Sequence, residues 1–181
     1  AVPNAPVVEL YSGEYTEATM IAVEPAESCK TFYTTDESEP TADSVPYTGP
    51  IPMPLGKTLF KFVNISSEGI ASEVTTRTFT LRLRGAIAPD TAVTNLVNRL
   101  VETGYLDDAA GKNPRQSGIL SYQFSSVLRV GEEDYYTINE YYDDGTGLLS
   151  RTDKVFLVQV YEGTAAQLGY DENGEFMANV I

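Results

Sequence analysis

The residue types that carry most enzymatic chemistry are scarce in this sequence. Its 181 residues include no histidine, which removes the Ser-His and Cys-His nucleophile pairs, the imidazole base and nearly every zinc site. The single cysteine, Cys29, can form no intrachain disulfide and has neither metal-site spacing nor an activating base. We expect Cys29 to be a small buried hydrophobic side chain. The sequence therefore predicts no catalytic residue, no metal and no cofactor.

Carboxylates are abundant, and two of them could in principle hydrolyse a glycosidic bond without histidine. None stands in a recognisable active-site context, so a carboxylate-based glycoside hydrolase is the least favoured alternative. Acidic residues cluster at 36–43, 143–147 and 171–175 and resemble fragments of calcium loops. All three segments lack the full spacing of oxygen ligands. We interpret them as solvated turns.

Tyrosines are the most suggestive binding residues. Four of them lie in one expected strand: Tyr135, Tyr136, Tyr141 and Tyr142. Side chains alternate between the two faces of a strand, so one tyrosine of each adjacent pair should lie on the less buried side. An exposed row of tyrosines could stack against sugar rings or hold a peptide. The favoured alternative is packing on a half-buried sheet, because tyrosine has high β-propensity and the tryptophan typical of sugar-binding surfaces is absent.

The charge balance restricts the possible partners. Against 26 acidic side chains stand 12 basic ones, which gives a net charge of −14. A nucleic-acid partner requires a basic footprint, so this class is excluded. Residues 1–84 carry six basic and 11 acidic side chains, whereas residues 85–181 carry six and 15. The acidic second half favours neutral or cationic partners, although the charge could simply keep an exported protein soluble.

Residues 1–84 have the pattern of β-structure, with short runs of β-branched and aromatic residues between Pro, Gly, Ser and Asp clusters. In the run 74–83, residues of two kinds alternate as on a strand with two unlike faces. Several short strands at this spacing predict a small antiparallel sandwich. The expected strands cover 7–10, 20–23, 30–34, the neighbourhood of Ile51, 58–64 and 74–83.

One segment of this half resembles a known family. The run Phe32-Tyr33-Thr34-Thr35-Asp36-Glu37-Ser38-Glu39-Pro40-Thr41 is followed by Ser44, Tyr47, Gly49-Pro50-Ile51, Gly56-Lys57-Thr58-Leu59, Gly69 and Ser72. In this order and spacing, residues 6–80 resemble the chitobiase/β-hexosaminidase C-terminal-like domain. The resemblance implies an immunoglobulin-like β-sandwich, found beside glycoside hydrolase domains and in bacterial surface proteins, without a catalytic dyad to transfer.

The acidic turn of this segment has a structural interpretation. Asp36, Ser38, Thr41 and Ser44 can bond backbone amides within the turn, while a proline fixes one φ angle. Glu37 departs from the family pattern, because the family usually has glycine at this position. Glutamate tolerates a positive φ poorly, so the geometry of the turn after Asp36 could differ.

Residues 85–181 predict a different module, an α+β unit of one helix packed on an antiparallel sheet of about four strands. Apolar residues at 93, 96, 97, 100 and 101 form one helical stripe. Pro89-Asp90 or Thr91 offers a side-chain N-cap, and Gly104 fits the C′ position. The polar loop 107–117 is long enough to suggest a function. Expected strands follow at 120–130, 135–142, 155–161, 167–170 and 176–181, with 155–161 central.

These observations favour a non-catalytic accessory or binding module pair of a bacterial exported or cell-surface protein, with a carbohydrate such as a cell-wall glycan or a protein as its ligand. The chain opens at Ala1 without a leader, so we expect a trimmed or processed chain whose signal or anchor is absent. No apolar run approaches the roughly 20 residues of a membrane span. Three alternatives stay open: a purely structural spacer, an inhibitor or chaperone module that offers an edge strand or loop 107–117 to a partner enzyme, and the carboxylate hydrolase.

Overall fold

The computed structural model describes residues 1–106, 119–161, 167–171 and 176–179. The chain divides into two compact units, Ala1–Leu83 and Arg84–Ile181. The described residues are mostly β-structure with one helix, as the sequence predicts. The expected loop 107–117 lies outside the described residues.

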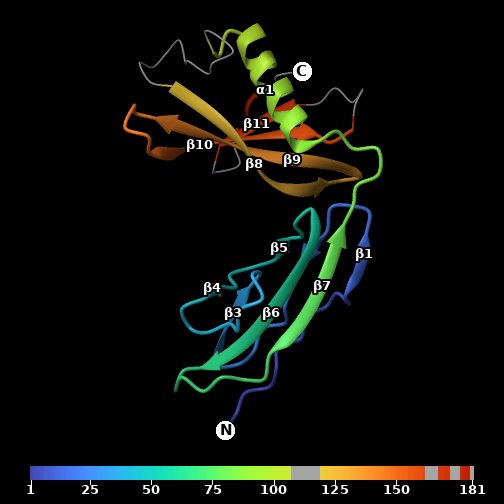
Figure 1. Ribbon diagram of the computed structural model, residues 1–181, viewed down its shortest axis with the longest axis vertical. Coiled ribbons are helices and arrows are strands. Elements are labelled where there is room, and N and C mark those ends of the chain that lie inside the picture. Colours follow the sequence, from blue (N-terminus) through green and yellow to red (C-terminus); the bar gives the residue numbers. More distant parts are fainter. Residues whose placement is uncertain (107–118, 162–166, 172–175, 180–181) are drawn as a thin grey trace. The chain divides into compact units, whose positions relative to one another are not determined.

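The first unit consists of two sheets. Five strands pair in the order β1-β7-β6-β3-β4, and two further strands pair as β2-β5. The long strands β6 and β7 run side by side along the unit (Figure 1). The strands are β1 (Gly13–Tyr15), β2 (Met20–Ile21), β3 (Cys29–Thr34), β4 (Val45–Pro46), β5 (Ile51–Pro52), β6 (Gly56–Ser66) and β7 (Thr75–Leu81).

Two details of the first unit differ from expectation. The expected strand 7–10 is reduced to a single bridge between Val8 and Val23, and the edge positions are taken by β1 and β4 instead. In addition, β1 pairs with β7 in parallel, so the sheet is not purely antiparallel. The strands β1 and β4 are too short to show a period in the sequence, and their positions depend on partner strands far away in the chain.

The core of the first unit lies between its two sheets. The five-stranded sheet contributes Phe60, Phe62 and Phe79, all fully buried. From the β2-β5 side come Ile21 and Met53. The ring centroids of Phe60 and Phe62 are 5.7 Å apart and their planes are nearly parallel, whereas Phe60 meets Phe79 edge-on at 5.8 Å. Aromatic contacts of this kind favour one packing over its alternatives.

The second unit is built on one five-stranded antiparallel sheet in the order β12-β11-β10-β9-β8. Its five strands correspond to the five expected runs, one more than the expected sheet of about four strands. Neighbours in sequence are neighbours in space, and β10 lies in the middle, as its nearly continuous apolar run predicts. The strands are β8 (Ile119–Val130), β9 (Glu133–Asp143), β10 (Leu149–Gln159), β11 (Gln167–Asp171) and β12 (Phe176–Asn179).

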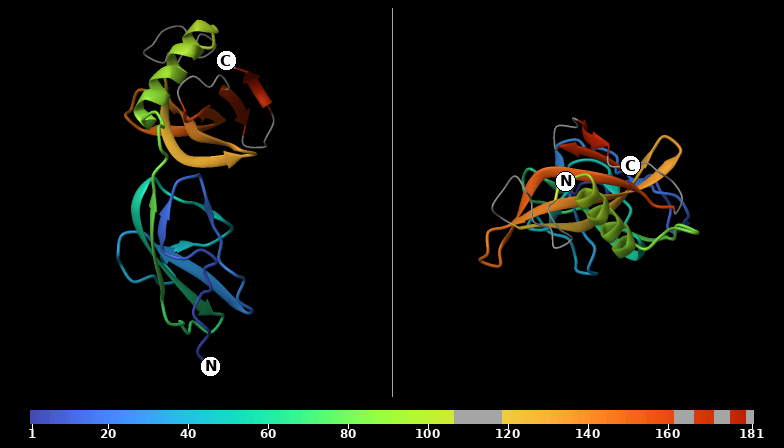
Figure 2. Two further views of the ribbon diagram at one scale, coloured as in Figure 1. Left: turned by 90° about the vertical axis from the view of Figure 1, so that its right-hand side faces the viewer. Right: turned by 90° about the horizontal axis from the view of Figure 1, so that it is seen from above.

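The helix α1 (Pro89–Glu102) packs on one face of this sheet, against β8 and β9 (Figure 2). Its expected stripe faces inward, with Leu96 and Leu100 fully buried. Gly104 ends the helix at φ +82°, and its N–H donates to the Val101 carbonyl, as predicted for C′. The predicted side-chain N-cap is wrong: Ala88 is the N-cap, and proline at the first position, which has no N–H to satisfy, sets the helix start.

Candidate functional site

The acidic turn that follows β3 is held by its own side chains. Asp36 accepts hydrogen bonds from the hydroxyl and the backbone N–H of Ser38. The Thr41 N–H donates to the Ser44 hydroxyl at 2.8 Å. These bonds confirm the predicted role of the short polar residues. The hydrogen bonds from Ser38, first from its hydroxyl and then from its amide, lower the pKa of Asp36 below its ordinary value.

Glu37 occupies the left-handed region, with φ +70°. Glu37 therefore adopts a backbone conformation that glycine reaches without strain. The Glu37 side chain is exposed, so no buried contact compensates the backbone strain. A salt bridge of 2.8 Å between Glu39 and Lys61 ties the turn to β6. Because its hydrogen-bonding groups are used internally, the turn acts as a stiff loop.

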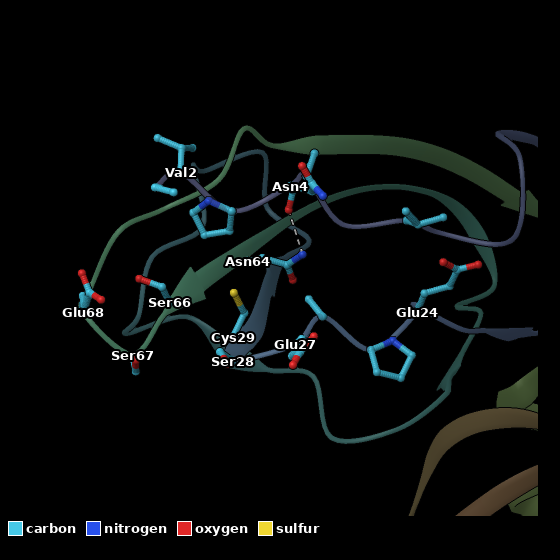
Figure 3. A pocket seen from close by; sticks show the side chains of 16 residues that line it. Val2, Asn4, Glu24, Glu27, Ser28, Cys29, Asn64, Ser66, Ser67 and Glu68 are labelled. Carbon is cyan, nitrogen blue, oxygen red and sulfur yellow. Dashed lines mark hydrogen bonds between the residues drawn. The ribbon is translucent and has the colours of Figure 1, made fainter.

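A pocket of about 550 Å³ opens at another place in the first unit (Figure 3). Its lining includes Cys29 and Asn64 together with three exposed carboxylates, those of Glu24, Glu27 and Glu68. Cys29 is a free cysteine of intermediate exposure, not the buried residue that we expected. It begins the strand β3, where the chain has just left an exposed turn. The exposed acidic lining suits a neutral or cationic ligand.

Asn64 organises the wall of this pocket. It is buried, and its amide accepts a hydrogen bond from Thr31 at 2.6 Å and donates one to the Asn4 carbonyl at 3.1 Å (Figure 3). Its backbone N–H donates to the Ser72 hydroxyl at 3.0 Å. Since these groups are all paired within the protein, Asn64 fixes the path of the N-terminal segment and does not offer its amide to a ligand.

The four candidate tyrosines lie on β9, but the structure does not bring them together as an exposed row. Tyr135 and Tyr136 are both buried, with 8% and 2% of their surfaces exposed. Tyr135 is the less buried of this pair, but it is still covered, so neither ring of the pair offers an exposed surface to a ligand. The Tyr136 hydroxyl donates to the Ile87 carbonyl, and burial raises its pKa.

Tyr141 and Tyr142 are half-buried. As successive residues of a strand they lie on opposite faces of the sheet. By register, Tyr141 stands between Ser121 on β8 and Arg151 on β10. Of the four candidates, only these two keep surface for a ligand, and each does so on a different face.

The strand β9 also carries a buried carboxylate that we did not predict. Glu140 has only 2% of its surface exposed. Tyr122 donates to its Oε2 at 2.7 Å, Tyr105 donates to the same oxygen at 2.9 Å, and Thr152 donates to Oε1 at 2.8 Å. We call these four residues the Glu140 cluster. Burial, together with the charge of Glu140, raises the pKa of Tyr122 far above its ordinary value.

The Glu140 cluster joins four segments of the second unit. Tyr105 follows the end of α1, Tyr122 belongs to β8 and Thr152 to β10. Phe156 packs edge-on against both tyrosine rings, at 6.3 and 5.9 Å. A carboxylate in such a place needs hydrogen bonds to offset the loss of water. Because both of its oxygens are already engaged, the arrangement is suited to positioning the helix end on the sheet.

A second buried carboxylate is held differently. Asp134, at the start of β9, forms a salt bridge of 3.0 Å with Arg129 and accepts a hydrogen bond from Tyr161 at 3.3 Å. Neither acid could be recognised from sequence, because each stands among exposed acids of the same type. The sequence offered one weak indication for Glu140. Its nearest neighbours on the same face of the strand, two residues away on either side, are apolar or aromatic.

Within the described ranges, no three His, Cys, Asp or Glu side chains are grouped closely enough to hold a metal ion. Part of the acidic turn 171–175 lies outside those ranges. No helix among the described residues has the length and apolar character needed to cross a membrane.

The geometry of the first unit thus defines a small domain of two β-sheets with a stiff acidic turn. Residues 10–76 match the family model of the chitobiase/beta-hexosaminidase C-terminal domain. The resemblance stated from the sequence is confirmed over these residues. Domains of this family are typically non-catalytic accessory modules in glycoside hydrolases. No match is found among curated proteins.

Proposed function

We propose that this chain is a non-catalytic accessory region of a bacterial protein that is exported or displayed on the cell surface, and that it binds a carbohydrate or protein partner there. The observation that carries the proposal is the match of residues 10–76 to the family model. The two sheets around one aromatic core support an immunoglobulin-like sandwich for the first unit. The helix on an antiparallel sheet supports an α+β class for the second.

The acids of the first unit support a non-catalytic role. A glycoside hydrolase needs a general acid whose pKa is raised, opposite a second carboxylate about 5–10 Å away. The pKa of Asp36 is lowered instead, and the acids that line the pockets are exposed. Solvent around an exposed carboxylate does not favour its protonated form.

Carbohydrate binding in the second unit has a defined test. We would titrate the ¹⁵N-labelled chain with chitin oligomers, peptidoglycan fragments and neutral glycans, and follow the backbone amides by NMR. Localised shifts around Tyr141 or Tyr142 are expected, because these rings keep exposed surface for stacking on a sugar.

The matched controls are alanine substitutions at three tyrosines. Tyr141→Ala should abolish shifts that surround Tyr141, and Tyr142→Ala should abolish shifts that surround Tyr142, because the two rings lie on opposite faces. Tyr11→Ala should leave either set unchanged, since Tyr11 is 81% exposed and lies in the first unit. Absence of any shift at millimolar glycan would refute sugar binding for the panel and would favour a spacer or a protein-binding role.

A further inference from the structure

The N-terminal segment of the first unit runs along β7 in the same direction as that strand. From Gly13 to Tyr15 it forms β1, which pairs in parallel with residues 79–81 of β7 (Figure 1). The backbone N–H of Arg82 continues the pairing, since it donates to the Tyr15 carbonyl at 3.0 Å. The segment that enters the unit and the strand that leads out of it are therefore bonded directly to each other, with the same polarity.

Three groups of β7 also hold the residues that precede β1. They donate hydrogen bonds of 2.6, 3.0 and 2.9 Å, in this order: the Thr75 hydroxyl to the Pro6 carbonyl, the Arg77 Nε to the Leu10 carbonyl, and the Thr78 N–H to the Ser12 hydroxyl. Positions rise in the same order on both sides, so these bonds extend the parallel pairing beyond the short strand β1. We call residues 6–15 and 75–82, with the hydrogen bonds between them, the parallel joint.

Other parts of the first unit fasten the same segment. Three further hydrogen bonds, of 3.1, 2.9 and 3.1 Å, join the Asn64 amide to the Asn4 carbonyl, the Glu24 N–H to the Val7 carbonyl, and the Glu9 N–H to the Ala22 carbonyl. Val8 is buried in the core. The segment is thus held along its length, although only β1 is a regular strand.

The direction of the parallel joint decides how the unit responds to tension. The chain enters the joint beside Thr75 and leaves it beyond Arg82, at the other end of β7. Tension between the two ends of the unit therefore slides one segment along the other. Hydrogen bonds between strands run across the strand direction, so sliding loads all of them together. Strands that are pulled apart from one shared end lose their bonds one after another instead.

We propose that the first unit is a force-bearing module, in which the parallel joint resists extension of the chain. Such resistance suits a protein that is held at a surface while another part of it is pulled. The inference goes beyond the proposed function, because the joint needs no ligand. Glycan titration and mechanical measurements are separate, so the failure of one proposal is distinguishable from the failure of the other.

The first experiment compares two pulling directions on the full-length chain by single-molecule force spectroscopy. Every chain carries Cys29→Ser, so that no native thiol reacts with a handle. In one direction, the handles are attached at the two ends of the chain. In the other, the first handle is moved to Thr16→Cys, an exposed position directly after β1. Because Thr16 and Arg82 lie at the same end of the joint, this second direction peels β1 from β7.

The two directions should give different unfolding forces for the first unit. We expect the force at equal loading rate to be at least about twofold higher with end handles, because several hydrogen bonds then share the load. The second unit is loaded in the same way in both directions, so the step whose length changes with the handle position belongs to the first unit. Equal forces, or a lower force with end handles, would overturn the proposal.

The second experiment removes one bond of the joint. Arg77→Met keeps a long side chain but loses the donor to Leu10. It should lower the unfolding force with end handles at least about 1.2-fold and leave the force with the Thr16 handle unchanged, because residues 1–15 then carry no load. A proportional loss in both directions would indicate general destabilisation and would overturn the proposal, as would an unchanged force with end handles.

Arg82→Met is the matched control. It removes the same charge from an exposed position next to β7, but it keeps the backbone N–H that takes part in the joint. Both forces should stay unchanged, and a loss equal to that of Arg77→Met would overturn the proposal by assigning the effect to charge. Where Arg77→Met does not fold, Ser12→Ala replaces it with the same expectations, because Ser12 is exposed and its hydroxyl accepts the Thr78 N–H.

Discussion

Glu37 offers a sharp test of the structure of the acidic turn. It holds a left-handed backbone conformation, with φ +70°, at the position where the resembling family usually has glycine. Its side chain is exposed, while the hydrogen bonds of the turn come from Asp36, Ser38 and Thr34. Replacing Glu37 by glycine should therefore remove backbone strain without removing a hydrogen bond.

The expected gain follows from two opposing effects. The left-handed conformation costs a residue with a Cβ atom about 1–2 kcal/mol. Glycine loses more conformational freedom on folding, which costs about 0.5–1 kcal/mol. The difference predicts that Glu37→Gly stabilises the first unit by about 0.5–1 kcal/mol. For a domain of this size, such a gain raises the melting temperature by about 2–8 °C.

The assay is urea unfolding of the full chain followed by NMR signals of β6 and β7, so that the first unit is measured separately. Glu37→Ala is the matched control, because alanine also has a Cβ atom and should gain little. A loss of stability in Glu37→Gly would refute the left-handed turn. An equal gain in both variants would assign the effect to removal of the negative charge.

Three further results are expected in the second unit. Tyr122→Phe should lower the free energy of unfolding by about 1–3 kcal/mol, because it removes a hydrogen-bond donor from the buried Glu140. The control Tyr142→Phe should change it by no more than about 0.5 kcal/mol. Equal losses for the two variants in urea unfolding would contradict the role of the Glu140 cluster. Above pH 10.0, the ordinary pKa of a tyrosine, Tyr122 keeps its proton in the folded chain and loses it in the unfolded chain. The contribution of Tyr122 to stability should therefore be complete below pH 10 and decrease as the pH rises above it. Tyr122→Phe should reduce this alkaline loss of stability in melting curves, and an unchanged slope would exclude Tyr122 as a source. Ser121→Ala should be neutral or slightly stabilising, since the buried Ser121 hydroxyl has no hydrogen-bond partner among the described residues; a loss above about 1 kcal/mol would show that a partner exists.

Features that depend on local sequence could be predicted well. The helix stripe, its glycine C′ and the long strands β6, β8 and β9 follow from periodicity over ten or so residues. The acidic turn followed from short polar side chains that reach neighbouring amides. The N-cap was missed because Asp90 and Thr91 are good capping residues, yet proline at the first helical position already satisfies the geometry.

Features that depend on distant partners could not be predicted. The strands β1 and β4 exist only because β7 and β3 offer them hydrogen bonds. Alternation places Tyr135 and Tyr136 on opposite faces of the sheet, but it does not reveal that both rings are buried. Glu140 is one of 26 acids, and its burial follows from three donors that lie 12 to 35 residues away.

The two units satisfy their buried polar groups by different means, and this affects how binding must be measured. The first unit uses neutral groups, such as the Thr31, Asn64 and Ser72 set. Among the described residues of the second unit, two carboxylates are buried. One of them pairs with Arg129, although residues 85–181 carry only six basic side chains against 15 acidic ones. The raised pKa of Tyr122 makes folding of the second unit depend on pH above 10, whereas exposed charge makes its encounters depend on salt. A change of pH or salt that weakens binding of a ligand at Tyr141 therefore reports on binding only where the Glu140 cluster is shown to be intact under the same conditions.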